Sequence, residues 1–157
     1  MKNLIVLFAL TASACFGQTM NQAAIVPDAN MISLMDEAKQ LMKIREDVPL
    51  PEIYPATFDY LKSMVCNGSS YCPVTAVYTS NKIYYRQDLN FNDLHSKSIL
   101  VHEFVHHIQA NIGYRAVNCD IWYKNEKEAY RLQAKYLRNN DQDDTSVREA
   151  VRIIKCP

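Results

Sequence analysis

Apolar residues recur every three or four positions along much of the chain, which is the spacing of helices that bury one face. This spacing predicts helices over residues 30–46, 58–65 and 125–137. Asp28 or Asn30 can cap the first helix. The helix over 125–137 carries its apolar residues at Ala129, Leu132, Tyr136 and Leu137.

A β-hairpin is predicted over residues 74–87, where two runs rich in β-branched and aromatic residues flank a polar turn at 79–82. A strand around 52–54 must be short and lie at a sheet edge, because proline cannot donate a hydrogen bond to a strand ladder. Three prolines punctuate this stretch: Pro49, Pro51 and Pro55.

Two further helices are predicted in the second half of the chain. One ends near Asn111, with Gly113 just beyond it, and starts after one of three capping residues, Asn92, Asp93 or Ser96. Ser146 and Glu149 form a capping box for the last helix. The order of elements predicts an α+β fold, a mostly helical single domain with the hairpin and an edge strand beside the helix that ends near Asn111.

Residues 1–17 are predicted to be a signal peptide, which leaves a mature domain over 18–157 and a loose, polar start at 18–27. Lys2 precedes a short apolar run, and small residues follow. Lipidation at Cys15 is the alternative, although the leucine of a lipobox is missing. We therefore expect an exported protein, periplasmic or secreted, with no transmembrane segment in the mature chain.

The composition fits one globular domain, with 48% hydrophobic residues and a formal charge of zero. A neutral chain offers no strongly basic surface to a polyanion, so nucleic acid is not expected as a partner. Function must therefore be sought in motifs rather than in the overall charge.

Four cysteines follow the predicted signal peptide: Cys66, Cys72, Cys119 and Cys156. An even number in an exported chain predicts two disulfides. Three pairings are open; one of them closes a short loop between Cys66 and Cys72 and joins Cys119 to Cys156. The alternative is a second zinc site, but no C-x-x-C spacing supports it.

Residues 102–106 read His-Glu-Phe-Val-His, an H-E-x-x-H motif inside the helix that ends near Asn111. On a helix, His102 and His106 lie on one face and can bind the same zinc ion. Glu103 lies beside the first ligand, where its carboxylate can take a proton from a zinc-activated water. The motif predicts a zinc-dependent hydrolase acting on a peptide or protein. The alternative is a pair of core histidines that bond to the backbone.

Two neighbours of the motif can also be assigned. His107 points about 100° away from His106 around the helix, so we expect a surface or supporting residue. Gln109 lies one turn beyond His106 and is expected to support the site.

Catalytic zinc takes three protein ligands and leaves one position for water, so a third ligand is needed. Gln109 and Ile112 stand where the metzincin motif has glycine and histidine. The best candidate is Glu126, in the segment Glu-Lys-Glu-Ala-Tyr at 126–130. This segment resembles the E-x-x-A-D of the gluzincins, the thermolysin-like H-E-x-x-H peptidases. The resemblance implies Glu126 as the third ligand, and Glu128 is the fallback because helix phase is not fixed by sequence.

The gluzincin resemblance spans about residues 74–137 and implies a small gluzincin-like core that hydrolyses peptides. Tyr130 stands where the family has the Asp that orients a ligand histidine, so Tyr130 or another group must take that role. The resemblance also implies that residues 82–86 form an edge strand that pairs with an extended substrate. It offers four candidate donors to the oxyanion: Tyr114, Tyr123, Tyr130 and His107.

The segments 102–109 and 122–130, with Gln133, also resemble a family of small exported bacterial proteins that have no assigned function. The first hypothesis is an exported zinc peptidase. The second is a zinc-binding scaffold module without proteolytic activity. The third is a disulfide-stapled helical protein that binds no metal.

Overall fold

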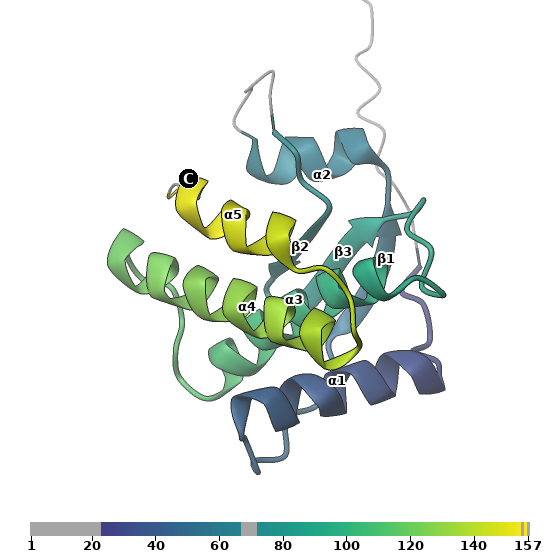
Figure 1. The fold of residues 1–157 in the computed structure, drawn as a ribbon. Coiled ribbons are helices and arrows are strands. Elements are labelled where there is room, and N and C mark those ends of the chain that lie inside the picture. The colour runs from purple at the N-terminus through teal and green to yellow at the C-terminus, as the bar shows by residue number, and fades with distance from the viewer. Residues whose placement is uncertain (1–22, 67–71, 155, 157) are drawn as a thin grey trace, which may run out of the picture.

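The protein has an α+β fold, as the sequence predicts, and Figure 1 shows α2 above the sheet, α1 below it and α4 and α5 in front. The computed structural model describes residues 23–66, 72–154 and 156, so the predicted signal peptide at 1–17 and Cys15 lie outside the described residues. The elements of the described residues are α1 (Ala29–Met42), β1 (Glu52–Ala56), α2 (Phe58–Val65), β2 (Ala76–Thr79), β3 (Lys82–Arg86), α3 (Leu94–Asn111), α4 (Cys119–Asn139) and α5 (Thr145–Ile153).

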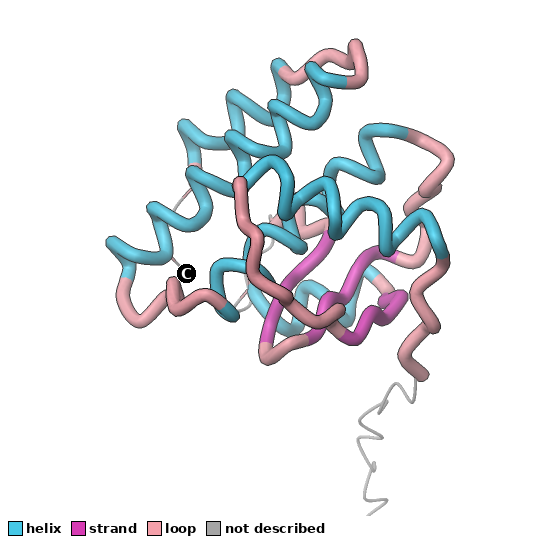
Figure 2. Tube along the Cα trace, turned by 90° about the horizontal axis from the view of Figure 1, so that it is seen from below, coloured by secondary structure: helices cyan, strands magenta, loops and turns pink. Residues whose placement is uncertain are grey.

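The strands of the described chain form one sheet in the order β1-β3-β2, and Figure 2 shows them side by side. β2 and β3 are joined by Ser80 and Asn81, which both have positive φ, as a tight hairpin turn requires. β1 runs parallel to β3, with Ile53 opposite Ile83 and both fully buried. β3 is therefore the central strand. The expectation that residues 82–86 form the free edge was wrong, since β2 is the edge strand on that side.

The core is built around α3, which contacts α1, α4 and β2. Its apolar side chains are fully buried on several sides of the helix, at Leu100, Val101, Phe104, Val105 and Ile108. A helix that buries apolar residues on several sides belongs in the interior. The helix carrying the H-E-x-x-H motif is thus the central element of the domain and holds its side chains in a rigid environment.

Two helix boundaries differ from the predictions. α1 ends at Met42 rather than 46, because Lys43 turns left-handed (φ 60°) and its N–H donates to the last carbonyls of the helix. α4 begins at Cys119, six residues before the predicted start at 125, where Asn118 Oδ1 accepts from Ile121 N at 2.9 Å. No residue of the first two turns of α4 (119–125) is buried, so these turns lie outside the buried apolar face on which the prediction was based.

Two further local predictions were wrong. Asp144, not Ser146, precedes α5, because its buried carboxylate pairs with Arg138 and Arg148. The segment 18–27 was expected to be loose; residues 18–22 lie outside the described residues, but in 23–27 Ile25 N donates to Ile53 O at 2.8 Å and extends the sheet beyond β1.

Two disulfides join Cys66 to Cys72 and Cys119 to Cys156, which confirms the disulfide prediction and selects one of the three pairings. The second bond fastens the first residue of α4 to the end of the chain. Disulfides of this kind are compatible with an exported protein.

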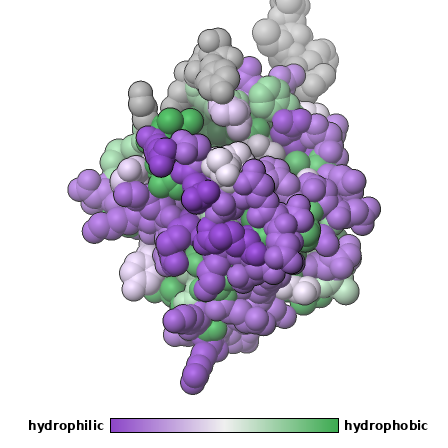
Figure 3. Space-filling view, in the orientation of Figure 1, coloured by the Kyte–Doolittle hydropathy of each residue, from purple (hydrophilic) through white to green (hydrophobic). Residues whose placement is uncertain are grey.

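The face that carries α4 and α5 is mainly hydrophilic, with separated apolar patches (Figure 3). In the part of the chain that the structure describes, no helix combines the length and apolar character that a membrane crossing requires.

Candidate metal centre

α3 carries the first three residues of the site. Asp93 caps the helix, its side chain accepting from Ser96 N at 2.8 Å, and the helix runs without interruption through the motif. His102 and His106, one turn apart, present their Nε2 atoms 3.0 Å from each other. Glu103, between them in sequence, is 6% exposed. The motif histidines are therefore neighbours in space, as helical spacing requires.

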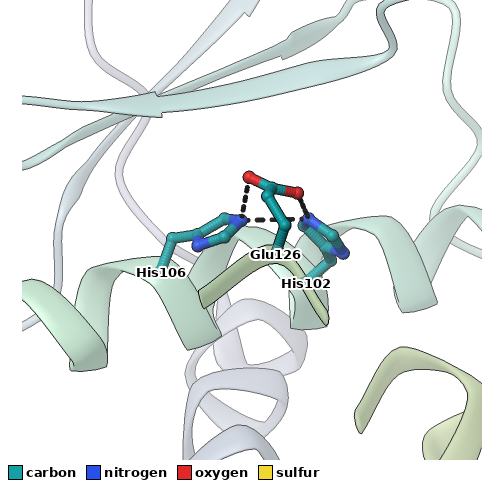
Figure 4. A group of neighbouring side chains, drawn as sticks. All are labelled: His102, His106 and Glu126. Atoms are coloured by element: carbon teal, nitrogen blue, oxygen red, sulfur yellow. Dashed lines mark hydrogen bonds and ion pairs between the residues drawn. The ribbon is translucent and has the colours of Figure 1, made fainter. Parts of the chain in front are cut away.

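Glu126 reaches the same point from α4, and Figure 4 shows the three side chains converging from two helices. Its Oε1 lies 3.1 Å from His106 Nε2, and its Oε2 lies 3.5 Å from His102 Nε2. The side chain of Glu126 is only 16% exposed. Packing of α4 along α3 thus brings together residues that are twenty positions apart in the sequence.

The spacing of these atoms suits a metal ion. Ligands about 2.05 Å from a tetrahedral zinc centre stand about 3.3 Å from one another. The separations of 3.0, 3.1 and 3.5 Å bracket that value. His102, His106 and Glu126 therefore form a group that could hold a metal ion, and of the groups sought among the described residues it is the one that qualifies.

The charges of the site favour a cation at its centre. Burial would raise the pKa of Glu126, but hydrogen bonds from His102 and His106 outweigh it and hold the pKa well below its ordinary value. For His106, burial acts to lower the pKa, and the Glu126 carboxylate reverses this and raises it. The carboxylate is thus ionised at neutral pH and stabilises positive charge beside the two rings.

Glu103 has the environment of a base. Burial raises its pKa, and the positive charges of His102 and His106 oppose the rise. A hydrogen bond from the backbone of Tyr78, in β2, also lowers the pKa of Glu103. The carboxylate of Glu103 therefore interacts both with the ligand group and with the edge strand β2.

Two glutamines contact the motif histidines at Nδ1, the ring nitrogen that does not face Glu126. Gln109 Oε1 lies 3.0 Å from His106 Nδ1, which agrees with its predicted supporting position. Gln133 Oε1 lies 3.1 Å from His102 Nδ1, a contact that the sequence analysis missed. A signal was present, because Gln133 follows Glu126 by seven residues and so shares its face of α4.

Tyr130 packs its ring against His102, a different contact from the hydrogen bond that the gluzincin aspartate makes to a ligand histidine. Its ring lies edge-on to His102, with centroids 4.5 Å apart. Burial, together with the carboxylates of Glu126 and Glu103, raises the pKa of Tyr130 to about 12. Its hydroxyl therefore keeps its proton at neutral pH and can act as a donor beside the ligands.

The fallback ligand Glu128 lies apart from the ligand group. Its side chain is 45% exposed, and its carboxylate accepts from Gln109 Nε2 at 3.1 Å and lies 3.9 Å from Arg131. Tyr114 and Tyr123, two of the candidate oxyanion donors, are 60% and 40% exposed.

His107 was expected at the surface or in support of the site, and the surface expectation was wrong. The ring is fully buried, and its Nε2–H donates to Pro49 O at 2.6 Å. Tyr78 packs edge-on against it at 5.5 Å. His107 therefore ties α3 to the segment before β1, and it has no proton free for an oxyanion.

Comparison with known proteins identifies a family. The sequence profile of a domain of unknown function, DUF6647, matches residues 33–151. The chain belongs to this family. The match agrees with the resemblance to proteins of unassigned function and gives no support for a gluzincin relationship. No curated protein and no solved structure matched the chain.

Proposed function

We propose that this member of the DUF6647 family is an exported zinc-dependent hydrolase, and more narrowly a peptidase of gluzincin type. One observation carries the proposal: two imidazole nitrogens and a carboxylate converge at zinc-ligand spacing beside the buried Glu103. Two nitrogen ligands of three favour zinc over magnesium or calcium, which prefer oxygen. A purely structural zinc site would take four protein ligands and would need no buried carboxylate beside them.

The side chains around the ligands have separate tasks in this proposal. When bound, zinc would supply Lewis acidity and lower the pKa of a water molecule toward neutrality. Glu103 would accept the proton of that water, since burial raises the pKa of its carboxyl and strengthens it as a base. The Tyr130 hydroxyl would donate to the substrate oxygen on which negative charge develops.

The free edge of β2 supports an extended peptide as the substrate. Arg86 N donates to Thr75 O at 2.9 Å, and the antiparallel register alternates from there. The backbone groups of Ala76 and Tyr78 therefore face away from β3; the Tyr78 N–H donates to Glu103, which leaves the Ala76 groups and the Tyr78 carbonyl for an added strand. Because Tyr78 also contacts Glu103, a strand added to this edge would run past the general base.

The decisive experiment compares Glu103→Gln with the wild type on a mixture of synthetic peptides, with cleavage followed by mass spectrometry. We expect the variant to retain one zinc per chain and to lose hydrolysis roughly 10²–10⁴-fold, the usual contribution of a general base. Glu128→Gln, which removes an exposed carboxylate nearby and leaves Asn125 O to accept from Gln109, should retain activity. A chelator should abolish cleavage by the wild type.

Two outcomes contradict the proposal. Full activity of Glu103→Gln would remove the general base from the mechanism. A wild-type protein that binds zinc and cleaves no peptide would favour the second hypothesis, a zinc-binding scaffold module.

A further inference from the structure

The amide of Gln133 stands in a chain of buried hydrogen bonds that runs from His102 to the backbone of α3. His102 Nδ1 lies 3.1 Å from Gln133 Oε1, and Gln133 Nε2 donates to Ser98 Oγ at 3.1 Å. The Ser98 hydroxyl in turn donates to His95 O at 2.7 Å. Ser98 is fully buried and Gln133 is 5% exposed, so water does not compete for these groups.

The last acceptor in this series of hydrogen bonds decides which group donates and which accepts in each of the others. His95 O is a carbonyl and can only accept, so the single proton of the Ser98 hydroxyl is committed to it. Ser98 Oγ must then accept from Gln133, which turns the amide nitrogen toward Ser98 and the amide oxygen toward His102. An oxygen facing Nδ1 requires a proton on Nδ1.

A second series of hydrogen bonds places a proton on Nδ1 of His106 as well. Gln109 Nε2 donates to Asn125 O at 3.2 Å and to Glu128 Oε2 at 3.1 Å. Both partners are acceptors without a proton, so the amide nitrogen must face them. Gln109 Oε1 is left 3.0 Å from His106 Nδ1, which must therefore donate. Gln109 is 1% exposed.

We propose that Gln109 and Gln133 are positioning residues that hold a proton on Nδ1 of both histidines, so that Nε2 is the nitrogen of each ring that faces the point shared with Glu126 and is available to a metal ion there. The two glutamines lie on different helices, Gln109 on α3 and Gln133 on α4, and their hydrogen bonds end on unrelated acceptors, yet they produce the same orientation. Two Nε2 atoms and a carboxylate meet there at 3.0–3.5 Å, and only positive charge between them, supplied by a proton or by a metal ion, offsets the repulsion of their lone pairs. The hydrogen-bond chains thus prepare the site for a metal ion.

Gln109 and Gln133 are also uncharged, and this matters for the proposed zinc-dependent hydrolase, on which this inference rests. Ligand histidines are commonly held by carboxylates, which make the ring a stronger donor to the metal. With neutral amides, a divalent ion beside Glu126 keeps one net positive charge. A more positive centre polarises water and a substrate carbonyl more strongly.

Nitrogen NMR of ¹⁵N-histidine-labelled protein without metal, near pH 8, tests the proton positions directly. We expect Nδ1 of His102 and of His106 to carry a proton in the wild type. Gln133→Met keeps the length of the side chain and removes the acceptor, so Nδ1 of His102 should lose its proton while His106 is unchanged. Gln109→Met should have the reciprocal effect. Gln133→Glu restores an acceptor and should restore the proton on His102.

Zinc affinity, measured by competition with a chromophoric chelator, gives the second readout. Each methionine variant should bind zinc roughly 10–100-fold more weakly, as loss of a supporting partner does elsewhere. Gln133→Glu should bind at least as tightly as the wild type. A role confined to packing would predict no selective change at one histidine and no rescue by glutamate.

The outcomes separate this proposal from the proposed function. An unprotonated Nδ1 in the wild type, or histidine signals unchanged in both methionine variants, would overturn the positioning role whether or not peptides are cleaved. Selective changes in a protein that cleaves no peptide would support the positioning role and contradict the peptidase.

Discussion

Exchanging either glutamate of α4 for glutamine tests which one is the third metal ligand. Glu126 is 16% exposed and directs both carboxylate oxygens at the histidine Nε2 atoms, at 3.1 and 3.5 Å. Glu128 is 45% exposed and contacts Gln109 and Arg131 instead. Glutamine has nearly the shape of glutamate, so the two variants differ mainly in where a charge is removed. Only Glu126→Gln should impair zinc binding.

The size of the effect follows from the position of each carboxylate. Losing a residue that supports a ligand costs 10–100-fold in affinity, so losing the charged ligand itself should cost at least about 100-fold. At a zinc concentration of about 100 times the wild-type Kd, binding stabilises the fold by about 2.7 kcal/mol, or roughly 10 °C in Tm for a domain of this size. With a 100-fold weaker site, the gain falls to about 0.4 kcal/mol, or roughly 1–2 °C.

Thermal unfolding with and without zinc measures this difference, and each variant serves as its own reference. Wild type and Glu128→Gln should both gain about 10 °C at the chosen zinc concentration. A zinc-induced gain that persists in Glu126→Gln and disappears in Glu128→Gln would refute the ligand assignment. Equal loss in both variants would show that charge near the site, rather than coordination, governs zinc binding.

Two further predictions concern stability. Replacing both cysteines of the Cys119–Cys156 bond, which are 37 residues apart, should lower the unfolding free energy by about 4 kcal/mol. The same change at Cys66–Cys72, with a separation of 6, should cost only about 2 kcal/mol, because a shorter loop restricts the unfolded chain less. Chemical denaturation of the two double serine variants would test this ranking, and a reversed order would contradict it. Burial lowers the pKa of His107 from its ordinary 6.5, so the unfolded chain takes up a proton there that the folded chain refuses, and stability should fall as the pH drops below about 6.5. His107→Gln can still donate to Pro49 O but does not titrate, so its denaturation midpoint should depend less on pH than that of the wild type; an identical pH dependence would show that His107 does not contribute to it.

Local patterns in the sequence were sufficient for most elements of the fold. α2 begins and ends where apolar spacing predicts, and the hairpin forms around residues that tolerate positive φ. The strand order was not available from local patterns, because the pairing of β1 with β3 joins segments about thirty residues apart. Two isoleucines, Ile53 and Ile83, meet there, and nothing near either residue in the sequence specifies the other.

The motif residues were predictable for the same local reason. His102 and His106 need only a helix to become neighbours, and the sequence shows that helix clearly. The supporting role of Gln133 depends instead on the contact between α3 and α4, which spans thirty-one residues. The position of Gln133 between Leu132 and Ala134 shows that it lies near the apolar face of α4, but it does not identify His102 as its partner.

The choice between the two glutamates depends on the rotation of α4 about its own axis. From the four apolar residues evident in the sequence, at 100° per residue, the centre of the buried face lies about 65° from Glu126 and about 95° from Glu128, which hardly separates them. The structure also buries Gln133 and Ala134. Including them moves the centre to about 40° from Glu126 and about 120° from Glu128. The buried glutamine that contacts His102 thus belongs to the same face that turns Glu126 toward the histidines, so one helix rotation supplies both the third ligand and the group that orients the first.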